Sequence, residues 1–93
     1  MLLPVYYAEL TVSERKQVRE QYIEAQQGKC YFCHQPLVDN PPPRVTNLKL
    51  NMSLFPSHFL KYPVHLQHNR KTGMTEGAVH AYCNAVLWQY HGR

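Results

Sequence analysis

Four side chains of the sequence have the types and the spacing of a zinc site. Cys30 and Cys33 form a C-x-x-C pair, and His80 and Cys83 form an H-x-x-C pair much later in the chain. Two such pairs can place four soft or borderline ligands in a tetrahedron around one zinc ion. The other interpretation is a redox-active C-x-x-C or a disulfide, but three cysteines leave one thiol over and no thioredoxin-like βαβ pattern surrounds the pair. We therefore expect one structural zinc ion.

A second pair of residues, His68 and Asn84, has the chemistry of a reactive site. His68 ends a strand-like segment, and Asn84 directly follows Cys83 in a helical segment. A neutral histidine can activate water near neutral pH. An amide oxygen can help to hold a divalent metal, which would neutralise a phosphate. The two residues could therefore cleave a phosphodiester bond if they face one cleft, although His68 alone would more often be a hydrogen-bonded structural histidine.

The elements that must position these residues lie between residues 62 and 92. Residues 62–68 are rich in β-formers and alternate loosely in polarity, which is typical of a half-buried strand. Residues 69–73 have turn composition, with Gly73 free to take a positive φ, and residues 74–79 can return antiparallel. Residues 81–91 are compatible with a helix that Gly92 would end. A hairpin on one helix is too small to be stable alone, so we expect the zinc to stabilise it.

Two further segments precede this region. A capping box, T-x-x-E at residues 11–14, predicts a helix that runs to about Gln27 and ends at Gly28. Three prolines at residues 41–43 predict an extended segment, and apolar alternation over residues 48–54 predicts a strand or an extended cover over the core. A basic cluster in the first turns of the helix could contact phosphate but is expected to be solvated: Arg15, Lys16 and Arg19.

Composition limits the class of protein. The 93 residues make one small domain, 1–93, with a modest core. Residues 1–39 hold four Lys/Arg against five Asp/Glu, whereas residues 40–93 hold six against one, so the basic excess lies in the second part. This imbalance suits a polyanion such as DNA, and a merely soluble basic surface is the alternative. No membrane-spanning run and no secretory start are present in the sequence, and with the odd cysteine count this predicts a cytoplasmic location.

Three motifs follow the first helix in a specific order: G-K-C-Y-F-C at residues 28–33, Q-H-N-R-K-T-G at 67–73, and G-A-V-H-A-Y-C-N at 77–84. Together they resemble the HNH (ββα-metal, or His-Me finger) endonucleases, most closely the phage recombination endonuclease VII branch. The resemblance covers roughly residues 1–38 and 60–92. It implies an α+β fold, namely a small zinc-stabilised ββα-metal domain with an N-terminal helix. It also implies a metal-dependent nuclease of a bacterium or a phage-infected host cell.

The resemblance assigns roles to individual residues. His68 falls at the general base and Asn84 at the helix ligand of a catalytic Mg²⁺ or Mn²⁺, while His80 replaces a usual cysteine of the structural zinc. Gln67 replaces a metal-binding carboxylate, and Arg70 replaces a second histidine. An amide is a weaker ligand for Mg²⁺ than a carboxylate, so either the metal is held weakly or another group helps. Softer donors would favour Mn²⁺ or Ni²⁺, and the candidate helpers are His65, Glu76 and His91.

These observations predict a metal-dependent DNA endonuclease or nickase with a histidine general base and one divalent metal. The alternative is a catalytically impaired, zinc-stabilised module that only binds nucleic acid, and a protein-interaction module is a third class. Arg70 and Lys71, on the turn beside the expected cleft, are predicted to contact DNA phosphates. A homodimer is one state that the sequence allows.

Overall fold

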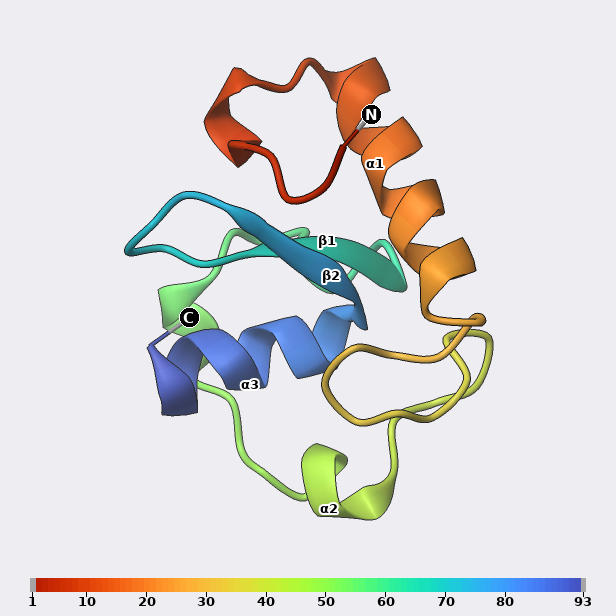
Figure 1. Ribbon diagram of the computed structural model, residues 1–93. Coiled ribbons are helices and arrows are strands. Elements are labelled where there is room, and N and C mark those ends of the chain that lie inside the picture. The colour runs from red at the N-terminus through yellow and green to blue at the C-terminus, as the bar shows by residue number, and fades with distance from the viewer. Residues whose placement is uncertain (1, 93) are drawn as a thin grey trace.

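The computed structural model describes residues 2–92, and its central element is a two-stranded hairpin. Strand β1 (Val64–His68) pairs antiparallel with β2 (Thr75–His80), and helix α3 (Ala81–His91) follows β2 directly. Helix α1 (Val12–Ala25) and the N-terminal segment lie on one side of the hairpin, and α3 lies on the other (Figure 1). The predicted α+β class, the hairpin and the C-terminal helix are therefore confirmed.

Local signals set the ends of both long helices. The Thr11 side chain accepts a hydrogen bond from the backbone N–H of Glu14 at 3.1 Å, and the Glu14 carboxylate accepts one from the N–H of Thr11 at 2.9 Å. This is the predicted capping box, which satisfies two free donors of the first turn. After α3, Gly92 has a φ of 68°, as a glycine that ends a helix does. Helix α1 ends earlier than predicted, because Gln26 is its C-cap and Gln27, with a φ of 57°, takes the left-handed position expected for a glycine. Gly28, with a φ of 74°, follows and donates its N–H to the carbonyl of Ile23 at 2.8 Å.

The hairpin contains one irregularity, which lies next to His68. Gln67 pairs with Gly77 and His68 with Thr75, so Glu76 is the extra residue of a β-bulge. The outer edge of β2 is partly covered by the N-terminal segment, because Thr75 donates its N–H to the carbonyl of Val5 at 2.8 Å. The sheet therefore leaves the other edge, that of β1, without a neighbouring strand in the described chain.

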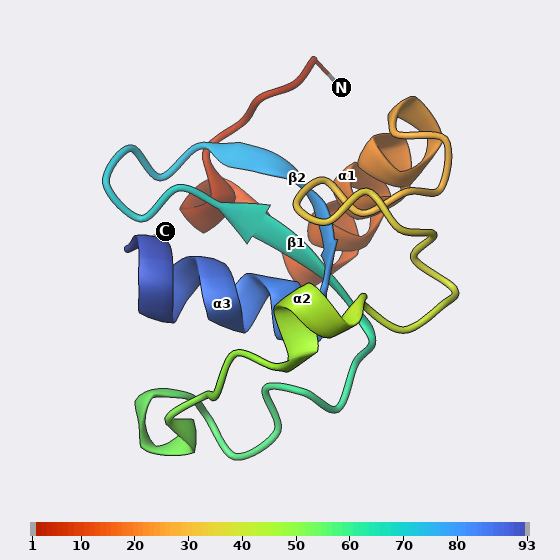
Figure 2. The same cartoon turned by 90° about the horizontal axis from the view of Figure 1, so that it is seen from below.

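The segment between α1 and β1 differs from the prediction. The third proline begins a short helix, α2 (Pro43–Thr46), and a 3₁₀ turn, η2 (Met52–Leu54), stands where a strand was one of the two predicted forms. Leu48 and Leu50 do pack on the core, but hydrogen bonds from side chains of α3 hold this segment, so it forms a cover and not a strand. Figure 2 shows this cover beside α3.

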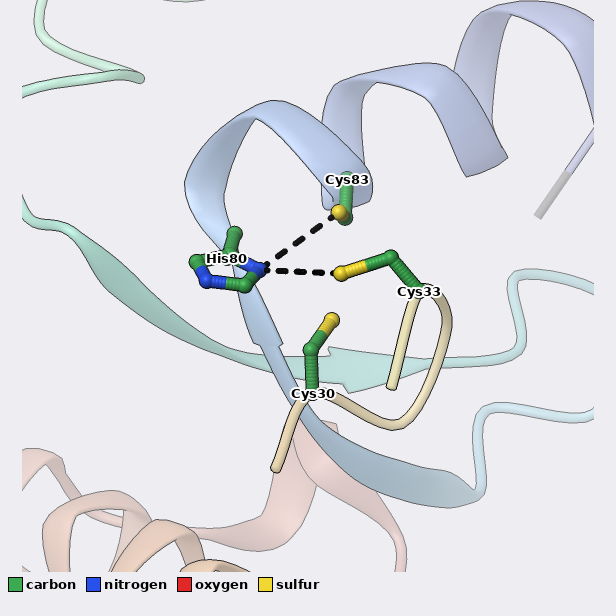
Figure 3. A group of neighbouring side chains, drawn as sticks. All are labelled: Cys30, Cys33, His80 and Cys83. Atoms are coloured by element: carbon green, nitrogen blue, oxygen red, sulfur yellow. Dashed lines mark hydrogen bonds between the residues drawn. The ribbon is translucent and has the colours of Figure 1, made fainter. Parts of the chain in front are cut away.

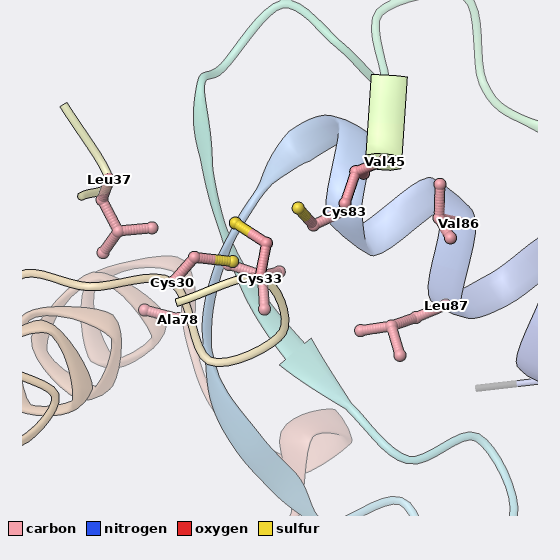
Figure 4. Close-up of a cluster of buried hydrophobic side chains, with 9 residues drawn as sticks. Cys30, Cys33, Leu37, Val45, Ala78, Cys83, Val86 and Leu87 are labelled. Atoms are coloured by element: carbon pink, nitrogen blue, oxygen red, sulfur yellow. The ribbon is translucent and has the colours of Figure 1, made fainter. Parts of the chain in front are cut away.

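The hydrophobic core has two parts. The larger part surrounds the three cysteines. It packs the turn that carries Cys30 and Cys33, called the knuckle below, against β2, α2 and α3 (Figure 4). The smaller part joins α1 to β1 through Leu10, Val18 and Leu66. No helix in residues 2–92 is both long and apolar enough to cross a membrane. Both parts of the core join residues of the first half of the sequence to residues of the second half.

Candidate metal centre and basic cleft

The four predicted zinc ligands meet in the interior of the protein (Figure 3). The ligand atoms of Cys30, Cys33, His80 and Cys83 lie within 4.8 Å of one another, and all four residues are buried. Nδ1 of His80 is 3.4 Å from Sγ of Cys33 and 3.7 Å from Sγ of Cys83. Three sulfurs and one imidazole nitrogen form a common donor set for structural zinc. The group can therefore hold a zinc ion.

The His80 ring is oriented for metal binding by backbone carbonyls. Its Nε2 lies 3.0 Å from the carbonyl oxygen of Pro36 and 2.8 Å from that of Asp39. Carbonyl oxygens only accept, so Nε2 carries the proton and donates. The lone pair is then on Nδ1, which faces the sulfurs, and this is the outer-shell arrangement that holds ligating histidines in place.

Ionisation of the three thiols is coupled. A hydrogen bond from the Cys83 thiol lowers the pKa of Cys30 to about 4, and the same hydrogen bond raises the pKa of Cys83. Burial raises the pKa of Cys33. One thiolate therefore forms at the expense of its neighbours, whereas a bound divalent cation would allow all three to ionise.

The knuckle that carries Cys30 and Cys33 is attached to β2 through a glycine. Tyr31 donates its N–H to the carbonyl of Ala78 at 2.9 Å. A side chain at Gly77 would place a Cβ atom 2.7 Å from Cγ of Tyr31, which is closer than atoms can pack. The absence of a side chain at Gly77 is thus what lets the first ligand pair approach the second.

Gln26, which sequence reasoning missed, joins the same elements. Its Oε1 accepts from the N–H of Ala78 at 2.9 Å, and its Nε2 donates to the carbonyls of Ala78 and Lys29 at 2.9 and 2.7 Å. The side chain acts as a short piece of strand beside β2. Nothing local in the sequence marks this role, because the partner is 52 residues away.

A cavity of about 480 Å³ lies along β1, between α1 and α3. It brings together His65, His68, Arg70 and Asn84, whereas Gln67 and Lys71 do not line it. Among the described residues, no carboxylate lines it. The remaining lining residues are Tyr7, Val12, Arg15, Arg19, Phe59, Tyr62, Val64, Leu66 and Trp88.

His68 is held in the cavity by an aromatic stack. Its ring lies 4.1 Å from the Tyr7 ring at an interplanar angle of 13°, and the guanidinium carbon of Arg15 lies 4.3 Å from the centre of the Tyr7 ring. Burial, together with the positive charges of Arg15 and Arg70, lowers the pKa of His68. His68 is therefore neutral over a wider pH range than a free histidine, as a general base needs to be.

His65 and Asn84 form a second polar pair in the cavity. The side-chain nitrogen of Asn84 lies 3.1 Å from Nδ1 of His65. The oxygen and nitrogen of an amide are exchanged by a simple rotation, so either atom of Asn84 can face the imidazole. Burial lowers the pKa of His65, which keeps its nitrogen available as a ligand. Phe59 packs edge-on against the His65 ring, with ring centres 4.8 Å apart.

Gln67 is buried against the partner strand of the hairpin. Its side chain is only 1 % exposed. Its Nε2 donates to the carboxylate of Glu76 at 2.7 Å and to the carbonyl of His68 at 3.1 Å, while its Oε1 has no hydrogen-bond partner in residues 2–92. Glu76 thus does approach across the hairpin, as the sequence allowed, and it meets Gln67 through the bulge. Gln67 as a metal ligand stays a prediction, and this placement gives it no access to the cavity.

The basic residues near the cavity fall into two groups, one on the hairpin turn (Arg70 and Lys71) and one on α1 (Arg15, Lys16 and Arg19). Arg70 stacks on Trp88, with the guanidinium carbon 4.1 Å from the ring centre, while Lys71 is exposed on the turn. Arg15 and Arg19 are half-buried and line the cavity from α1, so the expected solvation holds for Lys16 alone. Their spacing from Val12 places Arg15 and Arg19 on one stripe of the helix, and this stripe is the sequence pattern that could have predicted their shared position. His91 lies outside the cavity, against Phe32.

No protein-family model, no curated protein and no solved structure matches the chain. The resemblance to the HNH endonucleases therefore depends on the quoted motifs, and the functional argument depends on the geometry of the two sites.

Proposed function

We propose that the protein is a small HNH-type, zinc-stabilised nuclease that hydrolyses phosphodiester bonds of DNA with one catalytic divalent metal. The single observation that carries the proposal is the composition of the cavity along β1. A histidine with a lowered pKa, a potential metal-binding pair and three arginines line one space of about 480 Å³. A general base, a metal-binding position and cationic groups for the phosphate are the components that phosphodiester hydrolysis requires.

His68 is the proposed general base. Its lowered pKa keeps a nitrogen lone pair free to take a proton from water at neutral pH. The stack on Tyr7 fixes the plane of the imidazole, which limits the directions from which water can be activated. Arg70 lines the same cavity and provides a guanidinium that can donate to phosphate oxygens in pairs.

His65 and Asn84 are the proposed ligands of the catalytic metal. Their facing atoms are 3.1 Å apart, and two ligands at right angles around an ion at about 2.1 Å lie about 3 Å apart. The donors therefore fit an ion once the Asn84 amide turns its oxygen inward. When bound, the metal would neutralise the scissile phosphate and the leaving oxygen. An imidazole and an amide suit Mn²⁺ or Ni²⁺ better than Mg²⁺.

The zinc has a structural role in this proposal. His80 ends β2, and Cys83 lies in the first turn of α3 next to Asn84. Holding His80 and Cys83 on one ion fixes the angle between the hairpin and the helix. The zinc thereby sets the distance between His68 on β1 and Asn84 on α3 without touching the substrate.

The test is nicking of supercoiled plasmid DNA by the purified, zinc-loaded protein in Mg²⁺, Mn²⁺ or Ni²⁺. We expect relaxed circles in Mn²⁺ or Ni²⁺ and weaker nicking in Mg²⁺, because no carboxylate lines the cavity in the described chain. No nicking in any of the three metals, by protein shown to be folded and zinc-loaded, would contradict the proposal.

A second candidate is a module that binds nucleic acid without cleaving it. The observation that favours it is the same lack of a carboxylate beside His65 and Asn84. This candidate predicts salt-dependent DNA binding together with no nicking in any metal. The plasmid assay and a binding assay on the same preparation therefore separate the two candidates.

A further inference from the structure

We infer that α1 is part of the substrate site, and that Arg15 and Arg19 bind backbone phosphates of the nucleic-acid strand that reaches His68. This inference deepens the proposed function, on which it rests, by naming the surface that holds the substrate and the substrate class. The class is a polynucleotide strand that presents several phosphates, and not a single nucleotide. The geometry of the arginines carries the inference.

Arg15 has binding capacity that the protein itself does not use. Its side chain is half-buried beside Tyr7, and its Nε is buried with no hydrogen-bond partner in residues 2–92. A buried donor without an acceptor is costly, so its presence in a cavity wall indicates an acceptor that arrives with the ligand. A phosphate oxygen is the acceptor that a guanidinium fork fits best.

Arg19 extends this wall along the helix. It lies one turn after Arg15, which places the two side chains about 6 Å apart along the helix axis. Arg19 is half-buried and lines the same cavity as Arg15 and His65. Both arginines therefore face the cavity that also holds His68 and His65, and a strand running along β1 can meet both.

Only the basic residues of α1 that face the cavity, Arg15 and Arg19, form this wall, so the helix is not basic all round. Lys16 is next to Arg15 in sequence, but it is exposed and does not line the cavity. Arg70 supplies a cation from the hairpin turn, so positive charge reaches the cavity from two separate elements. Cations that reach the cavity from two separate elements suit a chain of phosphates, because each guanidinium group can then meet a different phosphate.

The experiment measures binding of a fluorescently labelled DNA oligonucleotide by anisotropy at several salt concentrations, with no Mg²⁺, Mn²⁺ or Ni²⁺ added. Arg15→Gln and Arg19→Gln are compared with Lys16→Gln, which removes the same charge from the same helix. Each arginine variant should reduce the slope of log affinity against log salt by about 0.7–0.9, the value for one lost phosphate contact. Lys16→Gln should leave the slope close to that of the wild type.

Zinc content and circular dichroism confirm that each variant is folded. Arg19→Gln remains informative even if Arg15→Gln disturbs the N-terminal segment, because it is Arg15 that stacks on the Tyr7 ring. Equal slopes for Arg19→Gln and Lys16→Gln would overturn the inference while leaving the nuclease proposal intact. Arginine-dependent binding by a protein that never nicks DNA would instead refute the nuclease proposal, while the inference that Arg15 and Arg19 bind phosphates would stand.

Discussion

The zinc centre and the basic cavity are built from adjacent residues of one helix turn, yet they differ in almost every physical property. Cys83 belongs to a closed set of four buried donors within 4.8 Å of one another. Asn84, the next residue, lines an open cavity of about 480 Å³. Successive residues of a helix point about 100° apart, so one turn can serve both places.

The difference between the two sites is one of completeness. The group of Cys30, Cys33, His80 and Cys83 offers four ligands and an outer shell of carbonyls, which is the pattern of a structural metal site. The cavity has only neutral donors, His65 and Asn84, and leaves room for water and a phosphate. We expect the closed site to contribute stability and propose that the open site contributes chemistry, so damage to each should have different consequences.

Removal of the zinc should have the largest effect. Structural zinc contributes about 10–16 kcal/mol of binding free energy in small zinc-folded peptides, so this domain should unfold without it. Cys30→Ser should therefore lose folded circular dichroism, and the wild type should contain one zinc per chain by elemental analysis. A wild type without zinc, or full folding of Cys30→Ser in excess chelator, would show that the hydrophobic core suffices.

Asn84→Ala and His65→Ala should affect the open site alone. Each should raise the Mn²⁺ concentration needed for half-maximal nicking by at least about tenfold, because each removes a proposed ligand. Zinc content and melting temperature should stay near those of the wild type. His91→Ala is the matched control, since His91 lies against Phe32 outside the cavity. A shift in His91→Ala equal to that in His65→Ala would contradict the assigned ligands.

The family resemblance and the observed geometry predict opposite results for Gln67→Asp. The resemblance predicts that a carboxylate here tightens Mg²⁺ binding. The structure places Gln67 against the carboxylate of Glu76, so the substitution should exchange a hydrogen bond for a repulsion and cost about 1–3 kcal/mol of unfolding free energy. We expect a lower melting temperature in chelator-free buffer and no gain of nicking in Mg²⁺. A gain in Mg²⁺ would show that residue 67 reaches the metal.

The pH dependence should show the smallest effect. Burial and the charges of Arg15 and Arg70 lower the pKa of His68 from 6.5, so the base stays neutral to a lower pH than a free histidine does. Nicking should therefore fall only as the pH drops through this lowered pKa, and the acid limb should lie below pH 6.5. Arg70→Gln should move the limb toward higher pH, whereas Lys71→Gln should not. An acid limb above pH 6.5 would mean that another group controls the rate.

The parts of the molecule that the sequence predicted are those with local signals. The capping box at Thr11, the helix end at Gly92 and the paired ligand spacing each depend on residues a few positions apart. Such signals have the same meaning in almost any fold. They were sufficient for the two long helices, the hairpin and the group of zinc ligands. That His68 and Asn84 line one cavity follows once the hairpin packs on α3, as the family resemblance implied.

The parts that the sequence did not predict depend on distant partners. Arg15 and Arg19 read as a solvated cluster, because only the packing of α1 on the hairpin turns their stripe toward β1. The alternation around Leu50 read equally well as a strand, because a cover held by α3 side chains has the same apolar period. Gln67 was predicted to face a metal, because the bulge at Glu76 cannot be inferred from residue types alone.

The central claim is that His68 performs chemistry in the open site while the zinc centre only holds the fold. Its most direct test is the initial rate of plasmid nicking in saturating Mn²⁺ by wild type, His68→Ala and the control His58→Ala, which alters an exposed histidine that does not line the cavity. His68→Ala should lose about two to four powers of ten in rate, with zinc content and melting temperature retained, and His58→Ala should match the wild type. A folded, zinc-loaded His68→Ala protein that nicks at the wild-type rate would contradict the account.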